Sequence, residues 1–122
     1  IIYTDSKTMT SIVSKPWGSF QVIEEGEKYM VKKIIVKPKG KLSLQSHEHR
    51  SEHWVVVKGR AQVTLNDDIK ILETNKSIFI PLQAKHSLAN NELEDLVVIE
   101  VWHGNILEEE DIKRYEDIYG RE

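Results

Sequence analysis

Short apolar segments separated by turn residues run through most of this chain. Ala61, Val63 and Leu65 alternate with polar neighbours, and this period of two is typical of a strand with one buried face. Polar turn residues such as Asn66 and Asp67 follow that segment. The same pattern predicts strands at residues 20–24, 29–37, 42–49, 54–58, 61–65, 69–72, 77–80 and 96–102. Many short strands at close spacing predict an all-β sandwich or barrel.

The last part of the chain has a different period. Apolar side chains within residues 108–119 recur at spacings of three and four, as on one face of a helix. These side chains are Ile112, Tyr115, Ile118 and Tyr119. Gly120 is suited to a helix stop, and the acidic residues 108–111 suit the positive end of a helix dipole. We therefore predict one C-terminal α-helix, packed against the outside of the barrel.

Length and composition indicate a single globular domain. The chain has 122 residues, of which 39% are hydrophobic and 30% are charged. Residues 1–14 are mostly polar and carry no clear period, so we expect a lead-in or linker followed by one domain at residues 15–122. The chain contains no cysteine, so any metal ion must be bound by nitrogen and oxygen ligands.

The charge distribution narrows the classes of partner. A formal net charge of -3 with no basic stripe argues against nucleic acid, because phosphate backbones bind clustered positive charge. No apolar run approaches the roughly 20 residues that a membrane helix needs, so no membrane partner is expected. A cytoplasmic location is the simplest interpretation of a chain without cysteine.

Imidazole and carboxylate side chains gather in one short segment. Gln45, His47 and His49 lie two residues apart, so an extended strand directs all three to one face. Glu52 follows closely, and His86 supplies another imidazole downstream. Neutral imidazole and carboxylate are good ligands for divalent first-row ions, and an amide oxygen is an acceptable one. The segment therefore holds the ingredients of a mononuclear metal site, although a polar edge strand accounts for the first cluster equally well.

The spacing of these residues resembles the two sequence motifs of the cupin superfamily. In the first motif a glutamate is followed, after six residues, by a glycine, as Glu52 is by Gly59. The usual gap of four residues before that glutamate leads to His47, and Gln45 lies two before it. The second motif runs glycine, five residues, proline, one residue, glycine, two residues, histidine, three residues, asparagine. This chain keeps that spacing with Asn75, Pro81, Gln83, His86 and Asn90, so Asn75 and Gln83 replace the glycines.

The Q-x-H variant, together with residues 15–18 and 110–121, is similar to the type II phosphomannose isomerase domain over about residues 15–121. That domain commonly forms the C-terminal part of bifunctional mannose-1-phosphate guanylyltransferase/mannose-6-phosphate isomerases. The resemblance implies a cupin double-stranded β-helix (a jelly-roll barrel), a divalent metal ion such as Zn²⁺, and a phosphorylated hexose substrate. The metal ligands that it implies are Gln45, His47, Glu52 and His86.

The resemblance also implies a reaction, the interconversion of mannose 6-phosphate and fructose 6-phosphate. A base removes the C2 proton, a cis-enediol forms, and the proton returns at C1. Arg50 is implied to hold the phosphate or an enediolate oxygen, and His49 and a metal-bound hydroxide are the candidate bases. Ser43 and Lys85 are implied to contact substrate. Structural alternatives are barrel filling by His49, a surface position for Arg50 and turn stabilisation by Ser43.

Other functions remain open at this stage. The main alternative is a non-catalytic sugar- or sugar-phosphate-binding cupin module. A cupin dioxygenase or sugar epimerase is a further alternative, and Gln45 argues mildly against a dioxygenase because those enzymes usually prefer a histidine-rich iron site. We expect a homodimer formed through edge strands, since pairing shields exposed backbone. The resemblance implies a role in GDP-mannose and surface polysaccharide synthesis, as a stand-alone isomerase or an excised domain.

Overall fold

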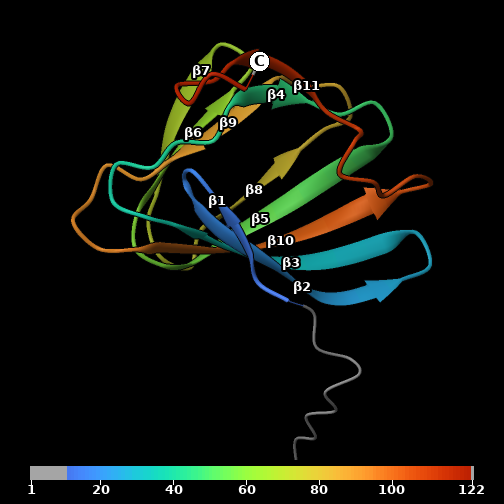
Figure 1. The fold of residues 1–122 in the computed structure, drawn as a ribbon, viewed down its shortest axis with the longest axis horizontal. Helices are drawn as coiled ribbons and strands as arrows, with labels where there is room; N and C mark the ends of the chain where they lie inside the picture. Colours follow the sequence, from blue (N-terminus) through green and yellow to red (C-terminus); the bar gives the residue numbers. More distant parts are fainter. Residues whose placement is uncertain (1–10, 122) are drawn as a thin grey trace, which may run out of the picture.

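Two antiparallel β-sheets face each other in the computed structural model, which describes residues 11–121 (Figure 1). The larger sheet has the strand order β1-β2-β3-β10-β5-β8. Its strands are β1 (Val13–Lys15), β2 (Gly18–Gly26), β3 (Tyr29–Val36), β10 (Leu96–Gly104), β5 (Arg50–Lys58) and β8 (Ser77–Ile80). The smaller sheet has the order β11-β4-β9-β6-β7. Its strands are β11 (Lys113–Glu116), β4 (Leu44–Ser46), β9 (His86–Ala89), β6 (Ala61–Leu65) and β7 (Asp68–Leu72).

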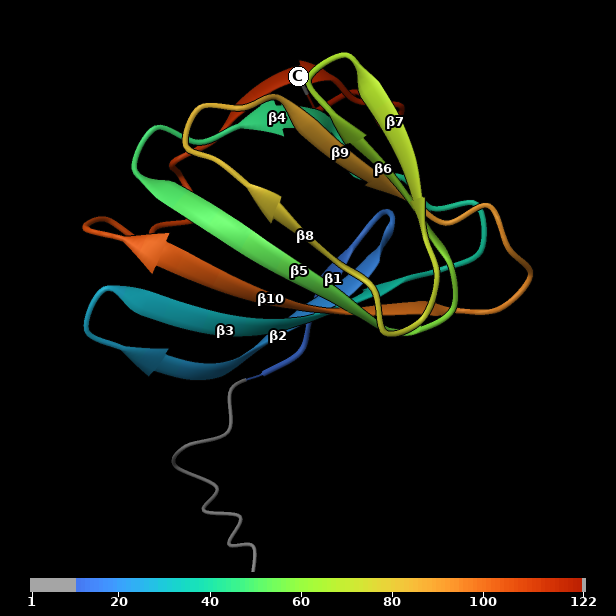
Figure 2. The same cartoon turned by 180° about the vertical axis from the view of Figure 1, so that it is seen from behind.

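From β3 onward the chain passes back and forth between the two sheets. Strands β3, β5, β8 and β10 lie in the larger sheet, while β4, β6, β7, β9 and β11 lie in the smaller one. The view from behind in Figure 2 shows the two sheets meeting along one side and diverging on the other. This winding is that of a double-stranded β-helix, so the predicted all-β jelly-roll class is confirmed.

The inner face of the larger sheet changes from apolar to polar along its strands. Val98 lies between Ile34 and Val56, and all three are buried. Two residues further along β10, Glu100 lies between Lys32 and Trp54, which are also buried. Burial alternates along β3 because successive side chains point to opposite faces of a strand. The apolar end forms the core, and the polar end is left to line a site between the sheets.

Three positions of the cupin-like motifs adopt left-handed backbone conformations. Gly59 has φ +92°, Asn75 has φ 75° and Gln83 has φ 66°. Glycine adopts such angles at no steric cost, and asparagine tolerates them better than most residues. Asn75 and Gln83 therefore adopt backbone angles of the kind that favour the glycines expected at these two motif positions. The turn at Gln83 bears on the site, because its backbone N–H donates to the carbonyl of His47 at 2.9 Å.

The strand predicted at residues 42–49 is shorter than expected. Strand β4 ends at Ser46, and the chain bends at residues 47–49 before β5 begins at Arg50. Strand alternation therefore stops at Ser46 and does not extend to His49. The pattern also gave no sign of β9, whose four residues are all buried and so show no alternation.

The predicted C-terminal helix is wrong, because no described residue between 108 and 121 is helical. Instead β11 adds to the open edge of β4, with Arg114 opposite Gln45. The hydroxyls of Tyr115 and Ser46 are hydrogen-bonded at 3.0 Å, while Ile118 stays 65% exposed. Backbone pairing with a free strand edge outweighs a weak helical period, which is a usual outcome of tertiary context.

The first described strand begins close to the N-terminal end of the described residues. Strand β1 begins at Val13, two residues before the boundary predicted at residue 15, and pairs with β2. Residues 1–10 of the predicted lead-in lie outside the described residues. Among residues 11–121, no helix is long and apolar enough to cross a membrane.

Candidate metal centre

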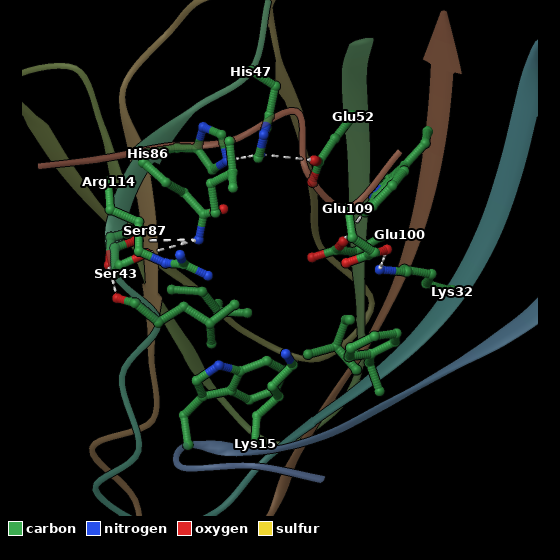
Figure 3. A pocket seen from close by; sticks show the side chains of 18 of the residues that line it. Lys15, Lys32, Ser43, His47, Glu52, His86, Ser87, Glu100, Glu109 and Arg114 are labelled. Carbon is green, nitrogen blue, oxygen red and sulfur yellow. Dashed lines mark hydrogen bonds and ion pairs between the residues drawn. The ribbon is translucent and has the colours of Figure 1, made fainter. Parts of the chain in front are cut away.

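A cavity of about 310 Å³ lies between the two sheets, at the polar end of the larger one (Figure 3). This volume falls at the lower end of the roughly 300–1,000 Å³ that is usual for small-molecule sites. Aromatic side chains, among them Trp17, Trp54 and Trp102, share the wall with charged groups. An apolar lining with a few polar groups directed inward suits a small polar ligand.

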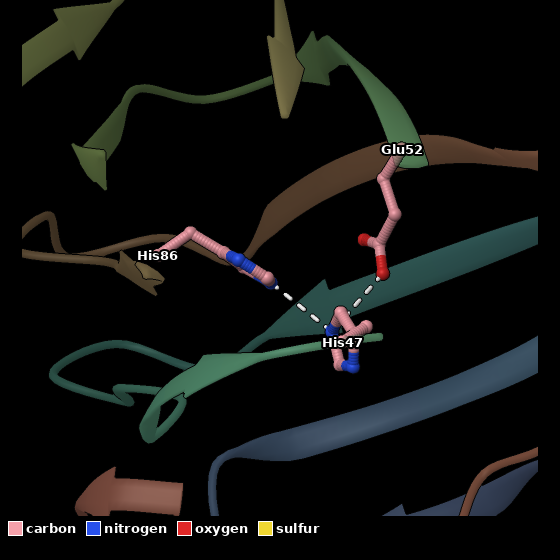
Figure 4. A group of neighbouring side chains, drawn as sticks. All are labelled: His47, Glu52 and His86. Atoms are coloured by element: carbon pink, nitrogen blue, oxygen red, sulfur yellow. Dashed lines mark hydrogen bonds and ion pairs between the residues drawn. The ribbon is translucent and has the colours of Figure 1, made fainter. Parts of the chain in front are cut away.

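Two histidines and a glutamate meet at one end of this cavity (Figure 4). His47 follows β4, Glu52 lies in β5 and His86 opens β9, so three separate segments supply the cluster. The two Nε2 atoms lie 3.2 Å apart, and His47 Nε2 lies 3.3 Å from Glu52 Oε2. Each residue is 3% exposed. One ligand atom of each residue lies within 4.8 Å of the others, which is close enough for one ion to be bound by all three.

The hydrogen bonds of the two imidazoles fix which nitrogen is free. His47 Nδ1 lies 2.6 Å from the carbonyl oxygen of Asp111, and His86 Nδ1 lies 2.9 Å from that of Ala84. A carbonyl oxygen only accepts, so both Nδ1 atoms carry the proton. In the neutral rings both Nε2 atoms therefore carry lone pairs, and they lie 3.2 Å apart, with the donor Nη2 of Arg50 3.1 Å from that of His47. Two lone pairs this close repel, and a cation bound by both nitrogens removes the repulsion.

The surroundings keep both rings neutral. Burial, opposed by the attraction of Glu52 and assisted by the positive charge of Arg50 and by His86, lowers the pKa of His47 to about 4. Burial likewise lowers the pKa of His86. Neutral imidazole is the form that binds metal ions, so the site is ready for a metal near neutral pH without releasing ring protons.

Glu52 supplies the negative charge of the cluster. Burial alone raises the pKa of a carboxyl group, but the nearby His86, Arg50 and His47, with a hydrogen bond from Arg50, hold that of Glu52 at about 2. Its Oε1 also accepts a hydrogen bond from Trp54 Nε1 at 2.8 Å. Both oxygens are thus fixed in place, and the group is a carboxylate near neutral pH.

Gln45 is placed beside the cluster as the sequence predicted. It lies opposite His86 in the β4–β9 pair and lines the cavity. Its Nε2 lies 3.3 Å from the Ser43 carbonyl oxygen and 3.4 Å from the Ser43 hydroxyl. With the amide nitrogen used in this way, the amide oxygen is the atom left to bind a cation. Two imidazoles, one carboxylate and one amide oxygen fit a divalent first-row ion.

Arg50 is not a surface residue, because it is 4% exposed and lines the cavity. Its Nε donates to Glu52 Oε2 at 2.8 Å, its Nη2 lies 3.1 Å from His47 Nε2, and its Cζ lies 3.4 Å from the centre of the Trp102 ring. Its Nη1 donates to the Glu108 carbonyl oxygen at 3.1 Å. A fixed, charged fork therefore lies directly beside the candidate metal ligands.

The segment after β10 organises the cluster from outside. The carbonyl oxygen of Asp111 orients His47, as described above. Its carboxylate accepts the backbone N–H groups of Glu48 at 2.9 Å and His49 at 3.0 Å. Such outer contacts orient metal-binding histidines in many sites. The sequence gave no sign of this role, since Asp111 was assigned to the start of a helix.

Two predicted site residues lie outside the cavity. His49 is exposed, because the chain bends after β4 and directs its side chain away from the face shared by Gln45 and His47. Lys85 is exposed as well, and its Nζ lies 4.3 Å from the centre of the Tyr115 ring. Neither residue enters the proposed mechanism. Ser43, by contrast, is 2% exposed and lines the cavity.

Sequence reasoning missed an ionisable pair on the cavity wall. Lys32 and Glu100 are cross-strand neighbours in β3 and β10 and are both buried. The Lys32 ammonium lies between the rings of Phe20 and Trp102 and pairs with Glu109 (Figure 3). Burial lowers the pKa of Lys32. One signal was available, since Glu100 interrupts the apolar run of residues 96–102.

Glu100 is expected to make the stability of the metal-free protein depend on pH. Burial, with the negative charge of Glu52, raises its pKa to about 8 from an ordinary 4.5. Between these values the folded chain holds a proton that the unfolded chain has lost, so stability falls as pH rises through this window. Glu100→Gln removes that slope. The urea midpoint of Glu100→Gln, relative to that of the wild type, should therefore rise as the pH is raised from about 5 to about 8.

The matched control for this measurement is Glu94→Gln, which changes an exposed glutamate. The difference between its urea midpoint and that of the wild type should stay constant across the same pH range. A constant offset between Glu100→Gln and the wild type would contradict the account of Glu100.

A protein family and several known proteins match most of this chain. The family model described as Mannose-6-phosphate isomerase C-terminal matches residues 4–117. Mannose-1-phosphate guanylyltransferase ManC of Salmonella typhimurium is 53% identical over 109 residues, which cover 89% of this chain and 23% of that protein. Alginate biosynthesis protein AlgA of Pseudomonas aeruginosa is 50% identical over the same coverage. The chain thus spans about a quarter of the length of these relatives.

Solved structures agree on the fold at low identity. A double-stranded β-helix protein from Klebsiella pneumoniae superposes with a TM-score of 0.74 at 15% identity, covering 95% of this chain and 97% of its own. An RmlC-like cupin from Shewanella frigidimarina gives 0.73 at 18% identity, covering 88% and 93%. The fold expected from the motif spacing, a cupin barrel, is confirmed.

Proposed function

This chain belongs to the Mannose-6-phosphate isomerase C-terminal family, and from that premise we propose that it interconverts mannose 6-phosphate and fructose 6-phosphate. The reaction is an aldose–ketose isomerisation through a cis-enediol, with a divalent metal ion, Zn²⁺, as cofactor. The observation that carries the proposal is the pair of facing His47 and His86 Nε2 atoms beside the Glu52 carboxylate, inside a cavity of substrate size. The proposed metal ligands are Gln45, His47, Glu52 and His86.

Different residues of the cavity have different roles in the proposed reaction. A divalent ion held by the cluster supplies Lewis-acid stabilisation of negative charge on substrate oxygens. Arg50 directs a fixed cation at the same region and stabilises the negative charge that develops on the enediolate. The Ser43 hydroxyl offers a hydrogen bond to a sugar hydroxyl. The aromatic wall around Trp102 excludes water, which strengthens each of these interactions.

The experiment that tests this function follows fructose 6-phosphate formation by the purified, zinc-loaded chain. We expect steady conversion of mannose 6-phosphate, with binding of the same substrate seen by calorimetry. Binding without conversion would contradict the isomerase and identify a non-catalytic sugar-phosphate-binding module. Absence of both binding and conversion would contradict both functions.

Two further proposals concern the oligomeric state and the cellular location of the protein. A homodimer through edge strands stays a proposal, supported by β8 at the edge of the larger sheet, where Phe79 is 48% exposed. Sedimentation equilibrium measures this directly, and a monomer mass would contradict it. A cytoplasmic location and a role in GDP-mannose and polysaccharide synthesis stay predictions. The names of the relatives, which include alginate and xanthan biosynthesis proteins, are consistent with that role.

A further inference from the structure

Arg114 has a buried nitrogen without a partner. Its side chain is half-buried, extends from β11 and lines the cavity beside Gln45. Its Nε is buried and finds no hydrogen-bond acceptor anywhere in residues 11–121. Buried polar groups in proteins are almost always hydrogen-bonded. This N–H group, on a side chain that lines the cavity, therefore lacks the acceptor that a ligand bound beside it would supply.

Three of the cavity's cations are already paired with carboxylates. Lys32 pairs with Glu109, Arg50 with Glu52, and Arg121 with Asp117. Within the described part of the chain, no carboxylate forms an ion pair with Arg114 or with Lys15, which also lines the cavity. Glu110 also lines the cavity, and it is exposed, as Lys15 is, so water and salt screen both charges. The cavity thus keeps two positive groups available to an anion.

These two groups lie apart from the two histidines and the glutamate of the metal cluster, although Arg114 is next to Gln45. Figure 3 shows Lys15 across the cavity from His47 and Glu52, with Arg114 on the wall between them. A sugar 6-phosphate has the same arrangement, because its reacting carbons lie at one end and its phosphate at the other. The guanidinium fork donates two parallel hydrogen bonds to a phosphate, and an ammonium adds a point charge.

We propose that Arg114 and Lys15 form a phosphate-monoester subsite on the cavity wall, extending from Gln45 away from His47 and Glu52. The proposal deepens the proposed function, on which it rests, by assigning the group that holds the phosphate of the substrate. Arg114 thus takes over a substrate contact that the resemblance implied for Lys85, whose side chain lies outside the cavity. The phosphate would accept the free Nε–H of Arg114, which explains why that group has no partner within the protein.

The test measures binding by calorimetry on the full chain, so it does not depend on turnover. The probes are mannose 6-phosphate, which carries the phosphate, and mannose, which lacks it. Arg114→Gln and Lys15→Gln should each weaken mannose 6-phosphate binding by about tenfold to a hundredfold, since each removes a charge-assisted contact. Mannose binding should stay unchanged. Repeating the titrations after metal removal separates this subsite from phosphate bound at the metal.

The matched control is Lys113→Gln, which removes one positive charge from the exposed neighbour of Arg114 in β11. It should keep the preference of the wild type for mannose 6-phosphate. The subsite would be overturned if Arg114→Gln preferred mannose 6-phosphate to mannose as strongly as the wild type does. It would also be overturned if the wild type bound the two sugars equally well. The preference can hold in a chain that does not isomerise and can fail in one that does. Failure of the subsite is therefore distinguishable from failure of the isomerase.

Discussion

His47→Ala is expected to remove bound metal and isomerase activity together, whereas His49→Ala is expected to keep both. The two histidines lie two residues apart, but only His47 is buried in the cluster with its Nε2 facing His86. Changes to groups that merely orient a metal ligand typically cost 10- to 100-fold in affinity or activity. Loss of a ligand itself should exceed that range, so we expect a fall of more than about 100-fold.

The measurement is metal content after dialysis, together with turnover, for both variants. His49→Ala is a close control because it removes the same side chain from the same segment. Comparable losses in the two variants would contradict the placement of the strand end at Ser46. Full metal content in His47→Ala would exclude His47 as a ligand.

Arg50→Ala is expected to lower turnover about 100- to 1,000-fold, the usual cost of losing one group that stabilises transition-state charge. The change also leaves Glu52 without its 2.8 Å partner, and breaking a buried pair costs about 3–5 kcal/mol. Turnover is therefore measured on metal-loaded protein, in which the ion compensates the charge of Glu52. Arg50→Lys keeps the charge but loses the fork, so it should recover stability while turnover stays low.

The matched control is Arg60→Ala, which removes an arginine that is 50% exposed and paired with Glu73. An exposed pair of this kind contributes little, so turnover and stability should both change slightly. Near-normal turnover in metal-loaded Arg50→Ala would contradict the catalytic role. It would make the contact between Arg50 and Glu52 purely structural.

Motif spacing predicted several of the residues that line the cavity. In a barrel of fixed geometry, the number of residues between two motif positions determines where their side chains lie. Counting back from Glu52 selected His47 and Gln45, and both line the cavity. His49 was misplaced because strand alternation was extended past Ser46, where the backbone bends. Alternation holds only while hydrogen-bonded strand geometry continues, and no local residue pattern marked its end.

The features that the sequence did not predict depend on pairing between strands that lie far apart in the sequence. The helix predicted from the spacing of Tyr115 and Ile118 competed with the free edge of β4, which a single sequence does not show. For the same reason Arg114 could not be assigned to the cavity before β11 was placed. Lys32 and Glu100 lie far apart in sequence, and only the β3–β10 register makes them neighbours.

The most direct test of the central claim measures mannose 6-phosphate turnover and bound metal on the same purified sample. A series from verified metal-free protein to full zinc occupancy is required. Turnover should be absent without metal, rise in proportion to the occupied sites, and return when Zn²⁺ is restored. Undiminished turnover in the metal-free sample, or none at full occupancy, would contradict a metal-dependent isomerase.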